Sequence, residues 1–215
     1  MNEKKEICLG MAGAGRASEL HMEALKRFSG IPICYKHIIA RRNEQVQAAQ
    51  KRFGFVNSSL NFDDLLNDPE IDVIDICTPP YAHAEMIEKA MNAGKHVICE
   101  KPLTGYFGEV GDEEPIGLKV SKVKMYEHLL KYLDHIEDLV KSSKTKFFYA
   151  ENFVYAPAIT KAAEIITKKQ SRILYAKGEE SLKGSSSHVA GEWNKTGGGT
   201  FIRTGSHPYG RNFMA

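Results

Sequence analysis

The chain has 215 residues and a mass of 24.0 kDa, which allows one large domain or one domain followed by part of a second. With 42% hydrophobic and 26% charged residues it can bury a sizeable core, so it is not an intrinsically disordered chain. The 29 basic residues exceed the 27 acidic ones by two, which argues against a protein that binds nucleic acid through its charge.

Apolar runs in the first 150 residues alternate with helical patterns. Each run is short, rich in β-branched or aromatic residues and mostly continuous, as in strands buried on both faces of a parallel sheet. The predicted strands are Glu6–Ala12, Ile33–Ala40, Ile71–Cys77, His96–Cys99 and Lys146–Ala150. This alternation predicts an α/β fold built on an N-terminal, doubly wound parallel sheet of the Rossmann type.

Amphipathic helices are predicted in the intervals between these strands. The first places five apolar residues on one face: Ala17, Leu20, Ala24, Leu25 and Phe28. The second spans Ala82–Ala93 and ends at Gly94, a residue type that favours helix ends. The third spans Ser121–Val140, with apolar residues three or four positions apart: Val123, Tyr126, Leu130, Leu133 and Ile136 or Val140.

The pattern changes twice further along the chain. Tyr106–Gly117 holds four acidic residues, three glycines and a proline, and we predict a solvated loop there. After residue 150 we predict a helix at Pro157–Lys169, a strand at Arg172–Gly178 and a polar stretch at Glu179–Gly199. We therefore expect one domain at residues 1–150 and the beginning of an α+β domain at residues 151–215.

The four cysteines, Cys8, Cys34, Cys77 and Cys99, lie in or beside the predicted strands. None forms a CxxC pair, so we expect no metal site and interpret them as small buried hydrophobes in a reducing, cytoplasmic environment. No apolar run approaches the roughly 20 residues of a membrane span, and the N-terminus does not resemble a secretory signal. We therefore expect no contact with a membrane.

A glycine-rich turn follows the first predicted strand and opens the first helix. Its sequence is Gly13-Ala14-Gly15-Arg16-Ala17-Ser18, a GxGxxG pattern with serine in the third place. Gly13 permits a tight turn, and Gly15 allows the backbone to approach a pyrophosphate. The free N–H groups at the helix start, around Arg16 and Ala17, would meet the phosphate charge. A dinucleotide site is the prediction, and an ordinary glycine-rich turn is the alternative.

The residues after the second predicted strand bear on the choice of cofactor. An NAD site carries a carboxylate there, which binds the ribose hydroxyls of the adenosine. This chain has Arg41 and Arg42 instead, and two guanidinium groups suit a 2′-phosphate. We predict that NADP(H) is favoured over NAD(H), with two solvated arginines as the alternative.

Three further segments, together with the Gly13 turn, resemble the glucose–fructose oxidoreductase / inositol dehydrogenase / MocA (Gfo/Idh/MocA) family. They are a Thr-Pro-x-x-x-His segment, a Gly-Lys-His-Val segment followed by Glu-Lys-Pro, and a Gly-Gly-Gly segment that ends in His-Pro. Their positions are Asp72–His83, Ala93–Leu103 and Gly197–Pro208. The resemblance extends from about Ile7 to Pro208, which is nearly the whole chain.

The resemblance implies a nicotinamide-dependent oxidoreductase acting on sugars, cyclitols or their derivatives. It implies a Rossmann domain followed by an α+β domain, which shapes the substrate site and commonly forms oligomers, so a homo-oligomer is possible. The lysine of Glu-Lys-Pro, here Lys101, is the usual catalytic residue and also lies at the cofactor. The Thr-Pro segment lies against the nicotinamide ribose in the family, which places Thr78, Pro79 and His83 near the cofactor.

The chemistry expected of Lys101 agrees with this implication. A lysine desolvated beside a cationic nicotinamide ring gives up its proton readily, so it can take a hydroxyl proton while hydride leaves the carbon. We expect Glu100 to lie at the cofactor and to orient Lys101 by ion pairing, and Pro102 is a candidate for a cis peptide bond. The alternative for Lys101 is a surface lysine before a turn.

The third segment departs from the family pattern Asp-x-Gly-x-His. His207 is present, but Arg203 stands in the aspartate position, and a guanidinium group cannot act as a base. We expect His207 to serve as acid, base or hydroxyl donor, and Arg203 to bind an anionic group of a substrate such as a sugar acid. The alternative is an ion pair of Arg203 with Glu151 or Glu180.

The resemblance adds one more substrate contact and leaves three functions open. Asn152 lies at the crossover into the second domain, a segment that borders the substrate in the family. Family members are usually much longer, so we interpret the sequence as a truncated product or fragment with part of the second sheet missing. The chain is predicted to be a dehydrogenase, and the alternatives are a non-catalytic redox sensor or regulatory protein and an inactive fragment.

Overall fold

A computed structural model of the protein describes residues 6–181, 183–184, 189–205 and 207. Its centre is a six-stranded sheet in the order β3-β2-β1-β4-β5-β6, and all the strand pairs are parallel. The strands are β1 (Ile7–Ala12), β2 (Ile33–Ile39), β3 (Asn57–Ser59), β4 (Val73–Ile76), β5 (His96–Glu100) and β6 (Phe147–Ala150). The strand order reverses between β1 and β4, and ligands of such sheets bind in the crevice at that point. The predicted Rossmann sheet is confirmed.

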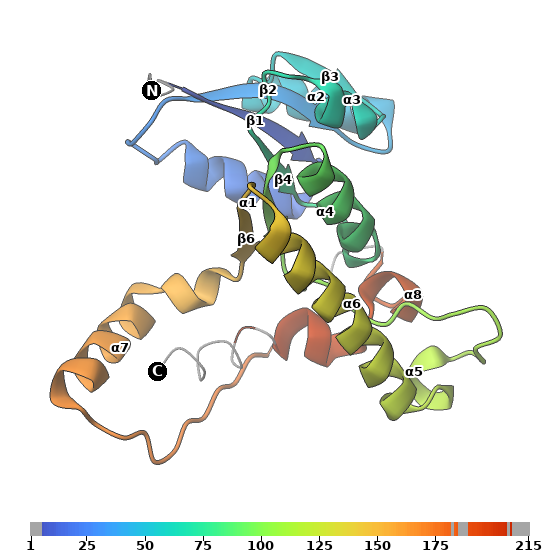
Figure 1. Ribbon diagram of the computed structural model, residues 1–215, viewed down its shortest axis with the longest axis vertical. Helices are drawn as coiled ribbons and strands as arrows, with labels where there is room; N and C mark the ends of the chain where they lie inside the picture. The colour runs from blue at the N-terminus through green and yellow to red at the C-terminus, as the bar shows by residue number, and fades with distance from the viewer. Residues whose placement is uncertain (1–5, 182, 185–188, 206, 208–215) are drawn as a thin grey trace.

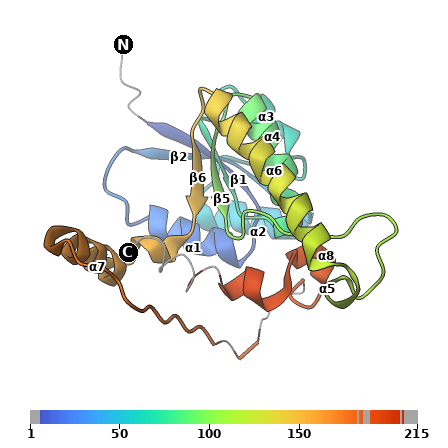
Figure 2. The ribbon, with the colours of Figure 1, turned by 60° about the horizontal axis from the view of Figure 1, so that its bottom comes forward.

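Helices cover both faces of this sheet (Figure 2). One face carries α1 (Arg16–Leu25) and α2 (Asn43–Phe53), and the other carries α3 (Asp63–Asn67), α4 (His83–Asn92) and α6 (Lys122–Ser142). The shorter or later elements are η1 (Pro80–Ala82), α5 (Ile116–Lys119), η2 (Asn152–Tyr155), α7 (Pro157–Lys169), α8 (Trp193–Thr196) and the π-helical turn η3 (Phe201–Gly205). No helix in the described part of the chain is long and apolar enough to cross a membrane.

Each face of the sheet has its own apolar core, because successive strand side chains point to opposite faces. On one face Leu9, Met11 and Ile38 pack with residues of α1 and α2, among them Met22 and Val46. On the other face the cluster combines β4, β5, α4 and α6: Ile74, Ile76, Val97, Ile87 and Ile136. A fully buried side chain of this size contributes about 1.5–3 kcal/mol, so the two clusters hold the strand ends rigidly.

The five predicted strands are present, with ends that differ by at most two residues from the prediction. The sequence analysis missed β3, a three-residue edge strand of Asn57, Ser58 and Ser59 that pairs only with β2. Its polar residues have neither the apolar run nor the alternation from which a strand is predicted.

The apolar face predicted for α1 is not the face that packs against the sheet. Leu20, Ala24 and Phe28 are exposed, and the buried residues are Ser18 and Met22. The sheet-facing side of this helix combines the apolar Met22 with the small, polar Ser18, which donates a hydrogen bond to the Gly15 carbonyl at 2.7 Å. A hydrophobic stripe therefore points away from the sheet.

The stripe predicted for α6 is wrong in the same way. The helix begins after Ser121, whose hydroxyl caps it by accepting from the Val123 N–H, and it extends to Ser142. Met125 and Ile136 are buried, whereas most of the predicted stripe is exposed: Val123, Tyr126, Leu130 and Leu133. The helix has two apolar stripes, and spacing alone does not decide which one meets the sheet.

The segment predicted as the solvated loop Tyr106–Gly117 is partly buried. Tyr106 and Ile116 form a third cluster with Val120 and Met125, and Trp193 packs against it. The Trp193 indole donates to the Tyr106 carbonyl at 2.9 Å, and the Tyr106 N–H donates to the Gly197 carbonyl at 2.8 Å. These contacts bring the last described segment back to the sheet domain, near the end of β5.

The chain after β6 differs from the prediction in one element. The helix Pro157–Lys169 is confirmed as α7, which has no buried residue and stands apart from the sheet (Figure 1). The predicted strand Arg172–Gly178 is wrong, because residues 171–180 have no regular secondary structure and are exposed. A strand needs a neighbouring strand for its backbone groups, and none pairs with this segment in the described residues.

Candidate functional site

The glycine-rich turn joins β1 to α1 at the switch point of the sheet. Gly13 has φ +112°, and a Cβ there would lie 2.6 Å from the Cys77 carbonyl oxygen, so only glycine fits between β1 and the end of β4. Gly15 is the N-cap residue of α1, and a Cβ there would meet nothing within 4 Å. The protein itself therefore needs Gly13, whereas the open space at Gly15 faces the free N–H groups of the helix start and suits a phosphate.

The residues around this turn leave its outer side open. Arg16 is exposed and forms an ion pair with Glu19, with the two atoms 3.0 Å apart, and Ala17 is half-buried. The Gln45 side chain donates to the Ala14 carbonyl at 2.9 Å, which ties α2 to the turn. The Gln45 contact thus adds α2 to the elements that hold the turn.

Arg41 and Arg42 follow β2 at the same edge of the sheet. Both are exposed, and Arg41 donates to the Tyr81 hydroxyl at 3.0 Å. Arg42 is the N-cap residue of α2. Neither forms an ion pair with an acid in the described part of the chain, so both guanidinium groups are available to an anion beside the turn.

His83 connects the ends of β4 and β5. Its ring nitrogens lie 2.8 Å from the Thr78 carbonyl and 2.9 Å from the Pro102 carbonyl, and the side chain is fully buried. Burial lowers the pKa of His83, although the two carbonyl oxygens oppose this effect. The structure therefore places His83 behind Thr78 and Pro79, where it fixes the backbone beside the turn.

Lys101 follows β5, and its peptide bond to Pro102 is cis, as the sequence analysis considered. Its ammonium donates to the carbonyl oxygen of Arg203 at 2.5 Å. The expected ion pair of Glu100 with Lys101 is wrong: Glu100 Oε1 lies 3.2 Å from His21 Nε2. The strand alternation explains this, because consecutive residues point to opposite faces and Glu100 faces α1.

His21 belongs to a cluster that the sequence analysis missed. His21 Nδ1 lies 2.8 Å from Asp75 Oδ2, and Asp75 is 1% exposed in the centre of β4. Cys77 Sγ lies 3.5 Å from the same nitrogen. An acid inside an otherwise apolar strand was the signal in the sequence, because a buried carboxylate needs a partner.

Glu151 is the second residue that the sequence analysis did not assign to the site. It follows β6, is buried, and its Oε1 lies 2.7 Å from His207 Nδ1. The ring of Phe153 packs against His207, with 4.4 Å between centroids. Glu151 Oε2 is buried without a hydrogen-bond partner among the described residues. The expected alternative, an ion pair of Arg203 with Glu151 or Glu180, is not present among the described residues: Glu151 lies against His207, and the Arg203 guanidinium faces the Ala190 carbonyl.

The remaining candidates are spread around Lys101. The Arg203 guanidinium donates a long hydrogen bond, of 3.4 Å, to the Ala190 carbonyl. Asn152 is exposed at the start of η2. The structure thus brings Lys101 to the Arg203 backbone and His207 to Glu151, and it leaves the Arg203 side chain and Asn152 at the periphery.

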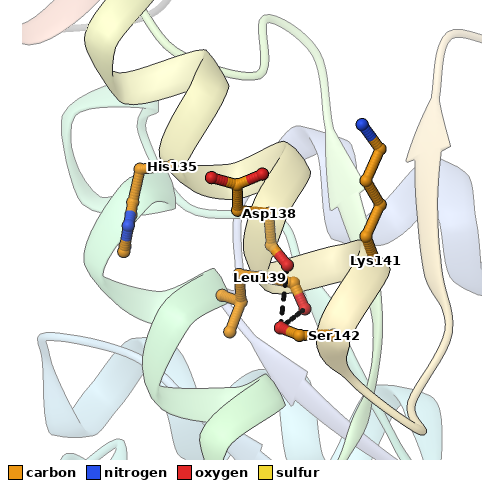
Figure 3. A pocket seen from close by; sticks show the side chains of 5 residues that line it. All are labelled: His135, Asp138, Leu139, Lys141 and Ser142. Atoms are coloured by element: carbon orange, nitrogen blue, oxygen red, sulfur yellow. Dashed lines mark hydrogen bonds between the residues drawn. The ribbon is translucent and has the colours of Figure 1, made fainter.

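Two other features could attract attention as sites. A shallow pocket is lined by five residues of α6, and the Ser142 hydroxyl there donates to the carbonyls of Asp138 and Leu139 (Figure 3). It lies on α6, on the face of the sheet opposite to α1, and not at the glycine-rich turn. None of the four cysteines forms a disulfide; Cys77 and Cys99 are buried, and Cys8 and Cys34 are half-buried. Potential metal ligands gather at Glu6, Cys8 and Cys34 and at His21, Asp75 and Cys77.

Comparison with known proteins agrees with this geometry. Residues 7–112 match the Gfo/Idh/MocA oxidoreductase family, in the part described as an NAD-binding Rossmann fold. Levoglucosan dehydrogenase of Pseudarthrobacter phenanthrenivorans is 35% identical over 137 residues, which are 60% of this chain and 33% of that protein. The 4-carboxy-2-hydroxymuconate-6-semialdehyde dehydrogenase of a Sphingobium strain is 37% identical over 95 residues, 44% of this chain and 30% of that protein.

Solved structures extend the likeness to almost the whole chain. A levoglucosan dehydrogenase in complex with NADH and levoglucosan superposes with a TM-score of 0.77 at 25% identity, covering 97% of this chain and 54% of that one. Its complex with NADH and L-sorbose gives a TM-score of 0.74 at 25% identity, with 97% and 53% covered. The chain therefore spans about half the length of these structures.

Proposed function

Because the chain belongs to the Gfo/Idh/MocA family of oxidoreductases with an NAD-binding Rossmann fold, we propose that it transfers hydride between a nicotinamide dinucleotide and a sugar, cyclitol or related hydroxy or keto compound. One observation carries the proposal. The glycine-rich turn after β1 and Lys101 after β5 lie at the same carboxyl edge of one parallel sheet. A dinucleotide that lies along this edge has its pyrophosphate at the turn and its nicotinamide toward Lys101.

The residues present fit such a cofactor. The space at Gly15 and the free N–H groups of α1 bind the pyrophosphate. Thr78 and Pro79, fixed from behind by His83, shape the wall beside it. When bound, the dinucleotide supplies the hydride acceptor or donor.

Lys101 is the proposed proton donor and acceptor at the substrate oxygen. In the oxidative direction the neutral amine takes the hydroxyl proton as hydride leaves the same carbon, and a carbonyl compound and an ammonium result. In the reductive direction the ammonium polarises the carbonyl and returns the proton. The present acceptor of Lys101, the Arg203 carbonyl, is neutral, so a substrate oxygen can replace it.

His207 is the proposed second proton-handling group. The Glu151 carboxylate on Nδ1 orients the ring, which leaves Nε2 as the group for the substrate. Glu151 Oε2 is buried and has no hydrogen-bond partner among the residues that the structure describes, which supports a polar ligand nearby, because such an oxygen costs free energy unless it accepts a hydrogen bond.

We also propose that the cofactor site prefers NADP(H) to NAD(H). The support is the pair of exposed guanidinium groups, Arg41 and Arg42, beside the turn. The double variant R41A/R42A should lose most of its NADPH affinity and keep its NADH affinity. The levoglucosan dehydrogenase complexes contain NADH, so the preference needs a direct test. If the double variant lost its NADPH and NADH affinities equally, the two arginines would not select NADP(H).

For the substrate, Arg203 suggests an anionic group, since within the described part of the chain its guanidinium makes one long hydrogen bond and no ion pair. The Sphingobium relative is named for a carboxylated compound. We propose a sugar acid or similar anion, bound by Arg203 with Asn152 at the edge of the site. Equal kcat/KM for matched acidic and neutral sugars would reject this assignment.

Residues 151–215 are proposed to begin the substrate and oligomerisation domain, and homo-oligomers are compatible with it.

The experiment that tests the main proposal compares cofactor binding with turnover. NADPH and NADH are titrated by nicotinamide fluorescence, and sugars and cyclitols are then screened. K101A should bind the cofactor as the parent does and lose turnover by about 10²–10⁴-fold, whereas the control K168A on the exposed helix α7 should lose nothing. A non-catalytic redox sensor is the competing function, and it would bind the cofactor without turning over any of the substrates.

A further inference from the structure

We propose that Glu6, Cys8 and Cys34 form a site for one zinc ion at the amino-terminal edge of the sheet. The site lies at the opposite end of β1 from the glycine-rich turn, so it is independent of the proposed dehydrogenase function. The sequence analysis expected no metal site because the chain has no CxxC pair. The ligands come instead from the beginnings of two neighbouring strands.

The strand register brings the two cysteines together. In the parallel pair β1–β2, Cys8 of β1 lies directly opposite Cys34 of β2, and residues paired in this way point to the same face of the sheet. Glu6 precedes Cys8 by two positions, so the alternation of side chains places it on this face as well. Three ligand types that are scattered in the sequence therefore meet at one point of the fold.

The three ligand atoms are close enough together to share one ion. A carboxylate oxygen of Glu6 and the Sγ atoms of Cys8 and Cys34 all lie within 4.8 Å of one another. Tetrahedral zinc, with bonds of about 2.3 Å to sulfur and about 2.1 Å to oxygen, holds such atoms about 3.5–3.8 Å apart. Side-chain rotation closes the difference, because Glu6 is exposed and both cysteines are half-buried.

The backbone that carries Cys8 is fixed by the residue that precedes β4. Asp72 Oδ2 accepts a hydrogen bond from the Cys8 N–H at 2.8 Å, and the Asp72 N–H donates to the Cys8 carbonyl at 2.9 Å. Cys34 is held in the same ladder by its position in β2. Ligands on such rigid strands need little ordering when the ion binds, and the exposed Glu6 side leaves a path for its entry.

The donor set decides which ion suits the site. Calcium and magnesium take oxygen ligands, so two thiolates disfavour them. Copper(I) prefers soft ligands throughout, whereas zinc accepts two thiolates together with a carboxylate. Each cysteine releases its proton to solvent as its bond to zinc forms, and water completes the tetrahedron.

A neighbouring cation does not oppose this assignment. The Lys36 ammonium interacts electrostatically with Cys34, but it forms an ion pair with Glu70. The Glu70 carboxylate therefore offsets its charge beside the proposed ion.

The test uses Co²⁺ as a spectroscopic probe and needs no turnover. The protein is treated with a chelator under reducing conditions and then titrated with Co²⁺. One equivalent should give the charge-transfer band of thiolate–cobalt bonds and the visible bands of a tetrahedral site, and Zn²⁺ should abolish both by displacement. C8S and C34S should each lose most of the charge-transfer band.

Three variants assign the remaining ligand and exclude the other cluster. E6Q should weaken Zn²⁺ binding roughly tenfold or more, whereas the control E23Q, which changes an exposed glutamate of α1, should leave it unchanged. C77S removes the thiol from the second group of potential ligands, His21, Asp75 and Cys77, and should retain the spectrum of the parent.

A measurement on the parent protein keeps the test decisive even if a variant fails to fold. Iodoacetamide labelling is followed by mass spectrometry under reducing conditions. Saturating Zn²⁺ should slow the labelling of Cys8 and Cys34 together by roughly tenfold or more, because a metal-bound thiolate is withdrawn from reaction, whereas Mg²⁺ should not.

Several results would overturn the proposal. They are a parent protein without the thiolate–cobalt band, a band that C77S removes and C34S retains, and equal labelling of Cys8 and Cys34 with and without Zn²⁺. A disulfide between Cys8 and Cys34 that forms in air and that Zn²⁺ does not prevent would likewise assign the pair to redox chemistry.

Discussion

Replacement of Gly13 by alanine tests whether the β1–α1 turn is fixed by the protein or by its ligand. At φ +112° an alanine is strained by about 1–2 kcal/mol, and its Cβ would lie 2.6 Å from the Cys77 carbonyl oxygen and 2.8 Å from the carbonyl carbon. Both atoms are backbone at the end of buried β4, so relief requires the strand to move, at a further cost of about 1–3 kcal/mol. G13A should therefore lose roughly 2–5 kcal/mol of unfolding free energy.

The matched control is G15A, two residues further along the turn. Gly15 has an ordinary φ, and a methyl group attached to its Cα would have no neighbouring atom within 4 Å, so G15A should unfold at the urea midpoint of the parent. If a pyrophosphate occupies the open space, the same methyl group should weaken nicotinamide binding by tenfold or more, which is about 1.4 kcal/mol. Urea unfolding by circular dichroism and a fluorescence titration measure the two effects. Equal stability of G13A and G15A would refute the geometric reasoning, and an unchanged affinity of G15A would refute the phosphate site.

Three other predictions follow from particular contacts. M22A should lose about 2–5 kcal/mol of unfolding free energy because Met22 is fully buried. L20A on the exposed stripe should lose under about 0.5 kcal/mol. Equal losses in urea unfolding would mean that the face first predicted for α1 is the buried one. Hydrogen bonds from Lys124, from Tyr106 and from the Glu109 N–H lower the pKa of Asp112 to about 2, so its contribution is present above its ordinary value of 3.8 and is lost as the pH falls toward 2; D112N should lower the urea midpoint at pH 7 and lose this difference near pH 2. E151Q should reduce kcat about tenfold or more without changing cofactor affinity, because His207 loses its charged partner, and an unchanged kcat would remove the pair from the mechanism.

The sequence was sufficient for five of the six strands and for the turn. Continuous apolar runs such as Ile33–Ile39 occur in buried parallel strands, and the Gly13 pattern has a backbone requirement that survives in any context. The faces of α1 and α6 could not be predicted, because each helix has apolar residues on more than one side and only the tertiary contacts choose between them. The side of α1 that faces the sheet carries Ser18 and the half-buried His21 beside Met22, and a hydrophobic pattern does not register these two polar residues.

The residues of the candidate site were predicted one by one, but the residues with which they form contacts were not. Glu100 and Lys101 are adjacent in sequence, which suggested an ion pair, but strand alternation sends their side chains in different directions. The partners that the structure supplies, His21 for Glu100 and Glu151 for His207, lie 79 and 56 residues away along the chain. Ion pairs between residues so far apart leave no local pattern in the sequence, so they can be identified only once the strand order is known.

The hydrogen bond from Lys101 to the Arg203 carbonyl joins residues that are 102 positions apart, and this separation has a kinetic consequence. Contacts between sequential strands and helices close short loops, whereas a distant pair bears the entropy of a long loop until the intervening chain is ordered. The turn at Gly13 is built from β1, α1 and the end of β4, so it forms with the early part of the sheet. We therefore expect the contact to Arg203 to follow later, so that a folding chain acquires a place for the dinucleotide before it acquires the surroundings of Lys101.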